Sequence, residues 1–140
     1  MLGNRGPDTK TLHILPTLLF RNTWSWGDEQ VKPNLSEMPS PKDAQWAVKA
    51  EHPTLGHYYL YGRQKAERLY TENESNAEKL WGSTNASPYV KDAFHRYLIN
   101  DEKTAVNPEQ TGTKFSAWHE VVVAPGQEVR SEERRVGKEC

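Results

Sequence analysis

The sequence has little of the material that several common kinds of functional site require. Its 140 residues include a single cysteine, Cys140, so a disulfide framework or a cysteine-based metal site is excluded. Basic residues do not outnumber acidic ones and the formal charge is −1, so the chain lacks the basic surface that binds nucleic acid or anionic membranes. No run approaches the roughly 20 apolar residues of a membrane span. We therefore expect no nucleic-acid partner, no membrane association and a cytoplasmic location.

Apolar residues are also scarce for a chain of this length. Hydrophobic residues make up 35% of the sequence, the mean hydropathy is −0.90, and nine prolines interrupt it. The length would suit one domain, but this composition is poor for a self-sufficient core. The start also lacks the basic-then-apolar pattern of a signal peptide. We expect a piece of a larger protein, in which Met1 is an internal methionine.

The last eleven residues, Arg130 to Cys140, differ in character from everything before them. They carry seven charged side chains and show no helix or strand period. Back-translated with ordinary codons, RSEERRVGKEC spells a common short-read sequencing adapter. We therefore predict that residues 130–140 are adapter-derived and disordered, and that the biological segment is residues 1–129. Without this tail, the formal charge is −2 and the only cysteine is gone.

Most of the regular structure that the sequence predicts is β. Thr11–Phe20 is apolar and of strand length, but Pro16 argues against one long central strand. Apolar and polar residues alternate in Gln45–Glu51, Pro53–Gly56 suits a turn and His57–Tyr61 is aromatic, which together predict a hairpin. Two further strands and two polar surface segments are expected; the strands are 66–70 and 115–124, and the surface segments are 28–43 and 106–114.

An amphipathic helix is predicted after Ser87, which can cap it, and Pro88, which suits its first position. It would end at Asn100, and its apolar stripe at helical spacing consists of Tyr89, Val90, Ala93, Phe94, Tyr97 and Leu98. A shorter helix-prone piece ends at Leu80-Trp81-Gly82. These elements predict a mainly β fold with one packed amphipathic helix, namely a partial β-sandwich that is a fragment of a larger sandwich domain.

Several blocks of the sequence, taken together, resemble one family of enzymes. They agree in order and spacing with bacterial and fungal glucosidase-like proteins of glycoside hydrolase family 63, which are related to mannosyl-oligosaccharide glucosidase. The matching blocks are Asn4–Pro7, Leu12–Thr17, Phe20–Gly27, Leu55–Gly56, Thr71–Glu74, Tyr89–His95, Val106–Pro108 and Gly112–Lys114. Two positions depart from the family pattern, since Leu19 stands where tryptophan is expected and Ser75 where threonine is usual.

The resemblance implies an architecture and an activity for a longer parent protein. Residues 1–129 would be part of an amino-terminal β-rich domain, and an (α/α) barrel of helices would follow it. Family members are similar to inverting α-glucosidases, in which a carboxylic acid protonates the leaving oxygen and a second carboxylate, about 6.5–9.5 Å away, activates water. Both carboxylates belong to the barrel. The resemblance therefore implies an oligosaccharide substrate, a barrel partner domain and no catalytic residue in this chain.

Two polar groups of residues are candidates for contact with that substrate. Arg21 and Asn22 supply donors that suit sugar hydroxyls, although a buried structural network would use the same groups. Glu72 and Glu74 flank Asn73, and two residues apart on an extended segment they face the same way. That geometry is poor for an opposed acid and base, and it suits a solvated loop or a loop that lines a cleft in the parent protein.

Aromatic residues form a third candidate group. Trp24 and Trp26 would share a face in an extended segment, and Tyr58, Tyr59 and Tyr61 lie in the predicted hairpin. A flat aromatic face suits the C–H face of a pyranose ring, so these side chains would form a stacking platform. Core packing is the commoner role of aromatics on adjacent strands. The candidate substrate-binding residues are therefore Arg21, Asn22, Trp24, Trp26, Glu72 and Asn73.

We expect no cofactor and no metal site, because the five histidines are scattered without ligand spacing. The hypothesis that competes with a glucosidase fragment is a carbohydrate-binding or structural β module that has no catalytic partner. The two hypotheses differ in the sequence expected beyond residue 129. A long continuation with helical periodicity and spaced carboxylates would favour the enzyme.

Overall fold

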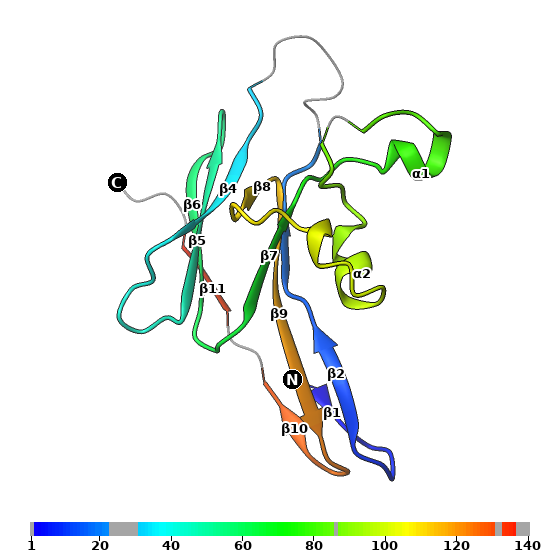
Figure 1. The fold of residues 1–140 in the computed structure, drawn as a ribbon. Coiled ribbons are helices and arrows are strands. Elements are labelled where there is room, and N and C mark those ends of the chain that lie inside the picture. The colour runs from blue at the N-terminus through cyan, green and yellow to red at the C-terminus, as the bar shows by residue number, and fades with distance from the viewer. Residues whose placement is uncertain (1, 23–30, 86, 131–132, 137–140) are drawn as a thin grey trace.

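The computed structural model describes residues 2–22, 31–85 and 87–130, and the backbone of residues 133–136. The fold is mainly β, as predicted, and its strands are antiparallel. Two main sheets lie in two layers, with the helices on the far side of the second layer (Figure 1). The arrangement is consistent with a partial β-sandwich.

The first sheet has the strand order β11-β6-β5-β4-β8. Its strands are β4 (Asn34–Met38), β5 (Trp46–His52), β6 (Gly56–Gly62), β8 (Thr111–Gly112) and β11 (Glu133–Val136). The predicted hairpin is confirmed, since β5 and β6 pair with Trp46 opposite Gly62 and His52 opposite Gly56. A Cβ atom at Gly62 would fall 1.9 Å from the Trp46 ring, so only glycine fits beneath this indole.

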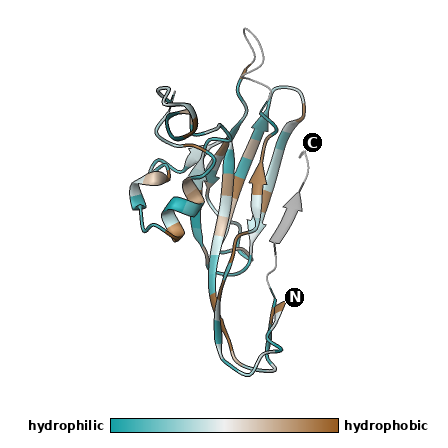
Figure 2. Ribbon diagram, turned by 90° about the vertical axis from the view of Figure 1, so that its right-hand side faces the viewer, coloured by the Kyte–Doolittle hydropathy of each residue, from teal (hydrophilic) through white to brown (hydrophobic). Residues whose placement is uncertain are grey.

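The second sheet is built around β9 (Lys114–Val123), which pairs with three other strands. They are β2 (Lys10–Ile14), β3 (Thr17–Leu19) and β7 (Glu67–Thr71). The apolar run at 11–20 is thus divided between β2 and β3 at Pro16, as the sequence predicts. Beyond the layered body, β2 and β9 continue as a ribbon that ends at a small sheet of β1 (Leu2–Gly3) and β10 (Glu128–Val129) (Figure 1, Figure 2).

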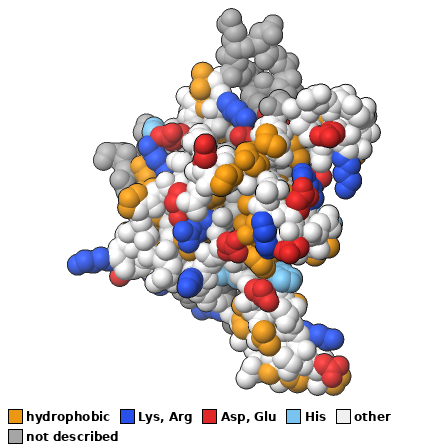
Figure 3. All heavy atoms as spheres, in the orientation of Figure 1, with side chains coloured by type: hydrophobic (Ala, Val, Ile, Leu, Met, Phe, Trp, Pro, Cys, Tyr) orange, Lys and Arg blue, Asp and Glu red, His pale blue; other side chains and the backbone are white. Residues whose placement is uncertain are grey.

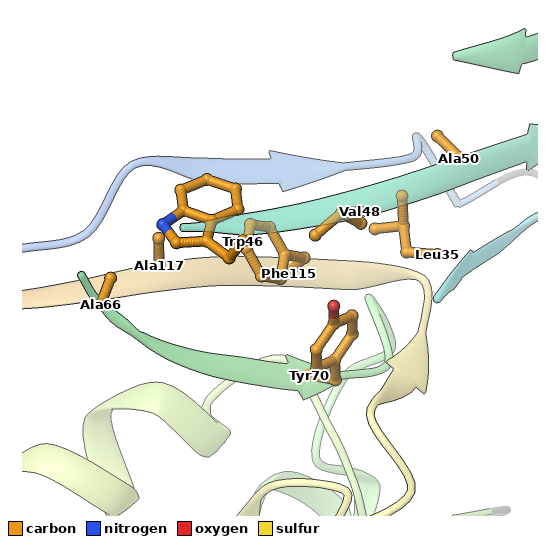
Figure 4. Packing of buried hydrophobic residues seen from close by; sticks show 8 residues of the cluster. All are labelled: Leu35, Trp46, Val48, Ala50, Ala66, Tyr70, Phe115 and Ala117. Atoms are coloured by element: carbon orange, nitrogen blue, oxygen red, sulfur yellow. The ribbon is translucent and has the colours of Figure 1, made fainter. Parts of the chain in front are cut away.

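The main core lies between the two sheets. Trp46 and Phe115 come from opposite layers, and their ring centroids are 5.5 Å apart (Figure 4). The buried members of this cluster are Leu35, Trp46, Val48, Ala50, Ala66, Tyr70, Phe115 and Ala117. Alternation along β5 therefore places Trp46, Val48 and Ala50 inward, as its sequence predicts.

The helices cover the other face of the second sheet. In α2 (Ala93–Leu98), Phe94 and Tyr97 pack with Leu69 of β7. The predicted helix start is wrong, because Ser87 Oγ accepts a hydrogen bond from the Tyr89 backbone N–H and does not cap α2. The chain reaches the helix as a turn, and α2 begins only after Asp92. The shorter helix is confirmed as α1 (Ala77–Trp81), which ends at Gly82 in the left-handed conformation.

Two segments that the sequence predicts to be surface connections contribute strands. The expectation that 28–43 has no core residue is wrong, since Leu35 on β4 is fully buried. Within 106–114, β8 pairs with the other edge of β4. A 3-10 turn, η1 (Lys103–Ala105), precedes it. Because one edge of β4 pairs with β8, which is far away in the sequence, its own polar composition does not reveal it.

Part of the segment 130–140 forms a strand, which the sequence does not predict. The backbone of 133–136 forms β11, which pairs with β6 in the register Glu133 opposite Gly62 and Val136 opposite Tyr59. The expectation that all of 130–140 is disordered is therefore wrong for these four residues, whereas the predicted adapter origin remains a prediction. Among the helices that the structure describes, none has the length and apolar character needed to cross a membrane.

Candidate functional site

Three chain segments meet where β3 and β7 end. Both strands pair with β9, and both Leu19 and Thr71 are opposite Lys114, at the beginning of β9. The residues that come after the two strands therefore emerge on either side of β9, beside Thr113. This register brings Asn22 and Asn73 together although they are 51 residues apart in the sequence.

Side-chain amides fasten the segments to one another. Asn22 Nδ2 donates to the Asn73 carbonyl at 2.9 Å, and Asn73 Nδ2 donates to the Phe20 carbonyl at 2.8 Å. The Asn73 backbone N–H donates to Thr113 Oγ1 at 2.8 Å, and that hydroxyl donates to Glu72 Oε2 at 2.6 Å. Each of these three loops is therefore held by polar contacts to another.

Lys32, just before β4, binds both acids of the loop. Its Nζ lies 3.0 Å from Glu72 Oε2 and 3.6 Å from Glu74 Oε1. The Glu72 and Glu74 side chains are 16% and 20% exposed, so both carboxylates are largely shielded but still reach solvent. Because one ammonium contacts both carboxylates, they lie on the same side of the loop. They do not face each other across a space for a sugar and a water molecule.

A second set of contacts joins the loop that bears Glu72 and Glu74 to the segment before α2. Buried Thr71 donates its hydroxyl to the Val90 carbonyl at 2.7 Å, and the Lys91 N–H donates to the Glu74 carbonyl at 2.9 Å. Lys114 Nζ donates to the Lys91 carbonyl at 2.8 Å. Burial lowers the pKa of the Lys114 ammonium from its ordinary value, and the nearby charge of Lys91 lowers it further. The acid-bearing loop is thus joined to the segment that leads into α2.

The structure brings together three of the six residues proposed from the sequence, Asn22, Glu72 and Asn73. Arg21 is adjacent and exposed. Trp24 and Trp26 lie outside the described residues. Sequence reasoning missed Lys32 and Thr113. Thr113 stands in one of the blocks that resemble the glucosidase family, but no sequence pattern indicates Lys32, because its partners come from a distant loop.

The tyrosines of the hairpin separate into two roles. Tyr58 packs against the main core. Tyr59 and Tyr61 point to the opposite face of β6, where their rings are nearly parallel, with an interplanar angle of 6° and centroids 6.4 Å apart. The core-packing alternative therefore applies to Tyr58, whereas Tyr59 and Tyr61 form a stacked pair on the outer face.

The site offers hydrogen-bonding groups and no obvious reaction centre. Two shielded carboxylates, an ammonium and a hydroxyl are gathered within one network. Among the residues that the structure describes, no group of three or more His, Cys, Asp or Glu side chains could hold a metal ion. Figure 3 shows acidic and basic side chains interspersed over the viewed face. Such a surface suits a neutral, hydroxyl-rich ligand better than a highly charged one.

Comparison with known proteins gives one informative similarity. No family model matches the chain, and no solved structure matches it. An uncharacterized protein of Saccharomyces cerevisiae, YMR196W, is 33% identical to the chain over 145 aligned residues. The alignment covers 87% of this chain but only 13% of the yeast protein. The chain is therefore similar to a short segment of a much longer protein.

Proposed function

We propose that the chain is part of the β-rich domain of a longer cytoplasmic glucosidase resembling glycoside hydrolase family 63. In this proposal the longer protein hydrolyses α-glucosyl linkages of oligosaccharides by the inverting mechanism, and an (α/α) barrel supplies both carboxylates. The great length of the yeast relative supports the presence of further domains. The mainly β fold is the one that the resemblance implies.

The observation that carries the role of this segment is the shared contact of Glu72 and Glu74 with Lys32. An inverting pair must stand on opposite sides of the scissile bond, about 6.5–9.5 Å apart, with room for water. Two carboxylates that bind one ammonium do not meet that requirement. We therefore assign this segment a non-catalytic role, in which it supports the barrel and lines one side of its cleft.

In this role the network would orient hydroxyl groups of the substrate. Thr113 and Lys32 hold the Glu72 carboxylate in place, so its remaining lone pairs point in fixed directions. Asn22 and Asn73 use their amide N–H groups on backbone carbonyls and keep the loops in position. The free energy of binding to such a preformed network offsets the entropy that a flexible glycan loses when it is oriented.

The test is glucose release from maltooligosaccharides by the longer protein, with polarimetry to follow the anomer formed. The proposal expects initial release of β-glucose, the inverted product. Glu72→Gln should raise KM with little change in kcat, because it weakens substrate binding without removing an acid or base. Glu120→Gln, at an exposed position of the distant β2–β9 ribbon, is the matched charge control. Absence of hydrolysis, or retention of the α configuration, would reject the proposed activity.

The stacked pair Tyr59 and Tyr61 favours a second candidate, a carbohydrate-binding module without catalytic activity. Parallel rings on an outer sheet face suit stacking against pyranose rings. Pull-down of the chain on insoluble α-glucan tests this candidate, with Tyr59→Ala as the variant and Leu55→Ala, an exposed residue of the adjacent turn, as the control. Retention that depends on Tyr59, in a longer protein that releases no glucose, would favour the module.

A further inference from the structure

A polar groove of about 740 Å³ lies between α1, the residues immediately after it, and α2. This volume falls within the range of about 300–1,000 Å³ that small-ligand sites occupy. The groove is separate from the candidate site but close to it in the chain. Asn76, which lines the groove, comes two residues after Glu74. We call it the α1–α2 groove.

One set of lining residues forms a rigid frame. Asn76 Oδ1 accepts from the Lys79 backbone N–H at 3.2 Å and from Asn85 Nδ2 at 3.0 Å. On the opposite wall, Arg96 donates from Nε to Glu102 Oε2 at 2.9 Å and from Nη2 to Oε1 at 2.5 Å. These bidentate contacts hold the walls in place before any ligand arrives, which reduces the entropic cost of binding.

A second set of lining residues remains available to a ligand. Within the described part of the chain, the side chains of Glu78, Lys79, Thr84 and Asn100 make no hydrogen bond or ion pair. All four are exposed, and together they present donors and acceptors of several kinds. The groove therefore combines fixed walls with unused hydrogen-bonding groups.

The charges of the groove indicate which class of ligand it would accept. Glu78 and Glu102 are balanced by Lys79 and Arg96, so the lining has no net charge. A phosphate or sulfate group would meet two carboxylates, and a cation would meet two basic groups. An uncharged molecule rich in hydroxyl groups would meet no such repulsion. Its hydroxyls can donate to the carboxylates and accept from Lys79, Thr84 and Asn100.

An exposed aromatic residue belongs to the same short helix as two of the lining residues, Glu78 and Lys79. Trp81 is 69% exposed at the end of α1, three residues after Glu78, so both lie on the same side of the helix. A large, flat and accessible indole on a helix that lines a polar groove suits stacking against the C–H face of a pyranose, with the sugar hydroxyls turned toward the polar lining.

We propose that the α1–α2 groove is a second binding site for a neutral oligosaccharide, with Trp81 as the stacking residue and Asn100 as a hydrogen-bonding residue. This inference rests on the proposed function, because it assigns the groove the same class of ligand as the site at Glu72 and Glu74. The backbone hydrogen bond from Lys91 to Glu74 joins the segment before α2 to the acid-bearing loop, so the two sites are built on connected segments.

The test measures the Kd of maltotriose for the longer protein by calorimetry. Trp81→Ala and Asn100→Ala should each raise Kd about tenfold, which corresponds to about 1.4 kcal/mol. Ile99→Ala is the control, because Ile99 is 66% exposed beside Asn100 but does not line the groove. The thermal midpoint of each variant establishes that folding is unchanged. The milder Thr84→Ala should raise Kd about threefold.

Glucose release by the same preparations separates the two proposals. If both groove variants bind maltotriose as tightly as the unmodified protein, the groove inference is overturned, whatever the hydrolytic activity. If these variants weaken binding but no preparation releases glucose, the groove inference stands and the proposed enzymatic function fails. Competition by inorganic phosphate at the groove would also overturn the inference, because an anion site would be present.

Discussion

The hydroxyl of Tyr70 on β7 donates a hydrogen bond to Glu37 Oε2 on β4 at 2.6 Å. The two strands belong to different sheets, so this contact fastens the two layers to each other. Tyr70 is fully buried, and Arg68 binds the other oxygen of Glu37 at 2.9 Å. A hydrogen bond to a carboxylate contributes more to stability when it is shielded from solvent than when it lies on the open surface.

Tyr70→Phe should therefore lower the free energy of unfolding by about 1.5–3 kcal/mol, because it removes one hydrogen bond to a carboxylate and little apolar area. Urea unfolding of the 140-residue chain measures this change. Tyr59→Phe is the matched control, since the Tyr59 hydroxyl has no hydrogen-bond partner among the described residues. Equal stability of the two variants would contradict a structural role for the contact.

Stability should also fall at alkaline pH through Tyr97. Burial and, to a smaller extent, the hydrogen bond to Glu67 together raise the pKa of Tyr97 from its ordinary 10.0 to about 12. As the pH rises, the unfolded chain loses this proton first, so the contribution of Tyr97 is complete below pH 10 and disappears between pH 10 and about 12. Tyr97→Phe should show a shallower decline of the urea midpoint over that interval. Parallel profiles would show that Tyr97 is not responsible.

Gly62→Ala tests the packing of the hairpin. A methyl group at this position would lie 1.9 Å from the Trp46 ring, and neither the buried indole nor the paired strands can move away freely. We expect a loss of about 1–3 kcal/mol in the free energy of unfolding, as for other overpacked cores. Gly6→Ala is the control, because its only near neighbour is the Asn4 side chain at 3.3 Å. Similar stability of both variants would refute the requirement for glycine.

Residues 1–129 without the tail should associate or fold poorly. Truncation removes β11 and exposes the backbone donors and acceptors of β6 to other chains. Light scattering and thermal unfolding of this shorter chain measure the effect, with the 140-residue chain as the reference. A cooperative transition of a monomeric 1–129 chain would count against this prediction.

The adapter origin of residues 130–140 has a direct test at the level of DNA. Reading the source DNA across the codon for Val129, from a library with a different adapter, should show that the codons for RSEERRVGKEC are absent and that the frame continues. Recovery of the same codons followed by a stop would reject the adapter origin. It would also favour the small binding module over the enzyme fragment.

The residues of the candidate site were only partly foreseeable. Asn22, Glu72 and Asn73 were proposed because their chemistry suits hydroxyl recognition and because they stand in blocks that resemble a glucosidase family. Lys32 was not proposed, although it is the residue that decides how Glu72 and Glu74 are arranged. An isolated lysine before Pro33 has no local pattern that would mark it, since its partners are about 40 residues away.

Local pattern by itself determined the β5–β6 hairpin, the division of the 11–20 run at Pro16, and the long strand β9. These features result from alternation, turn residues and the missing N–H of proline, all of which act within a few residues. The tertiary structure alone decided that polar segment 34–38 is a strand with Leu35 in the core. It also decided that Asn22 meets Asn73. The strand at 34–38 pairs with the distant β8 as well as with β5, and the contact of Asn22 with Asn73 depends on the pairing of β3 and β7 with β9. The free energy of such long-range pairing cannot be read from the local sequence of either segment.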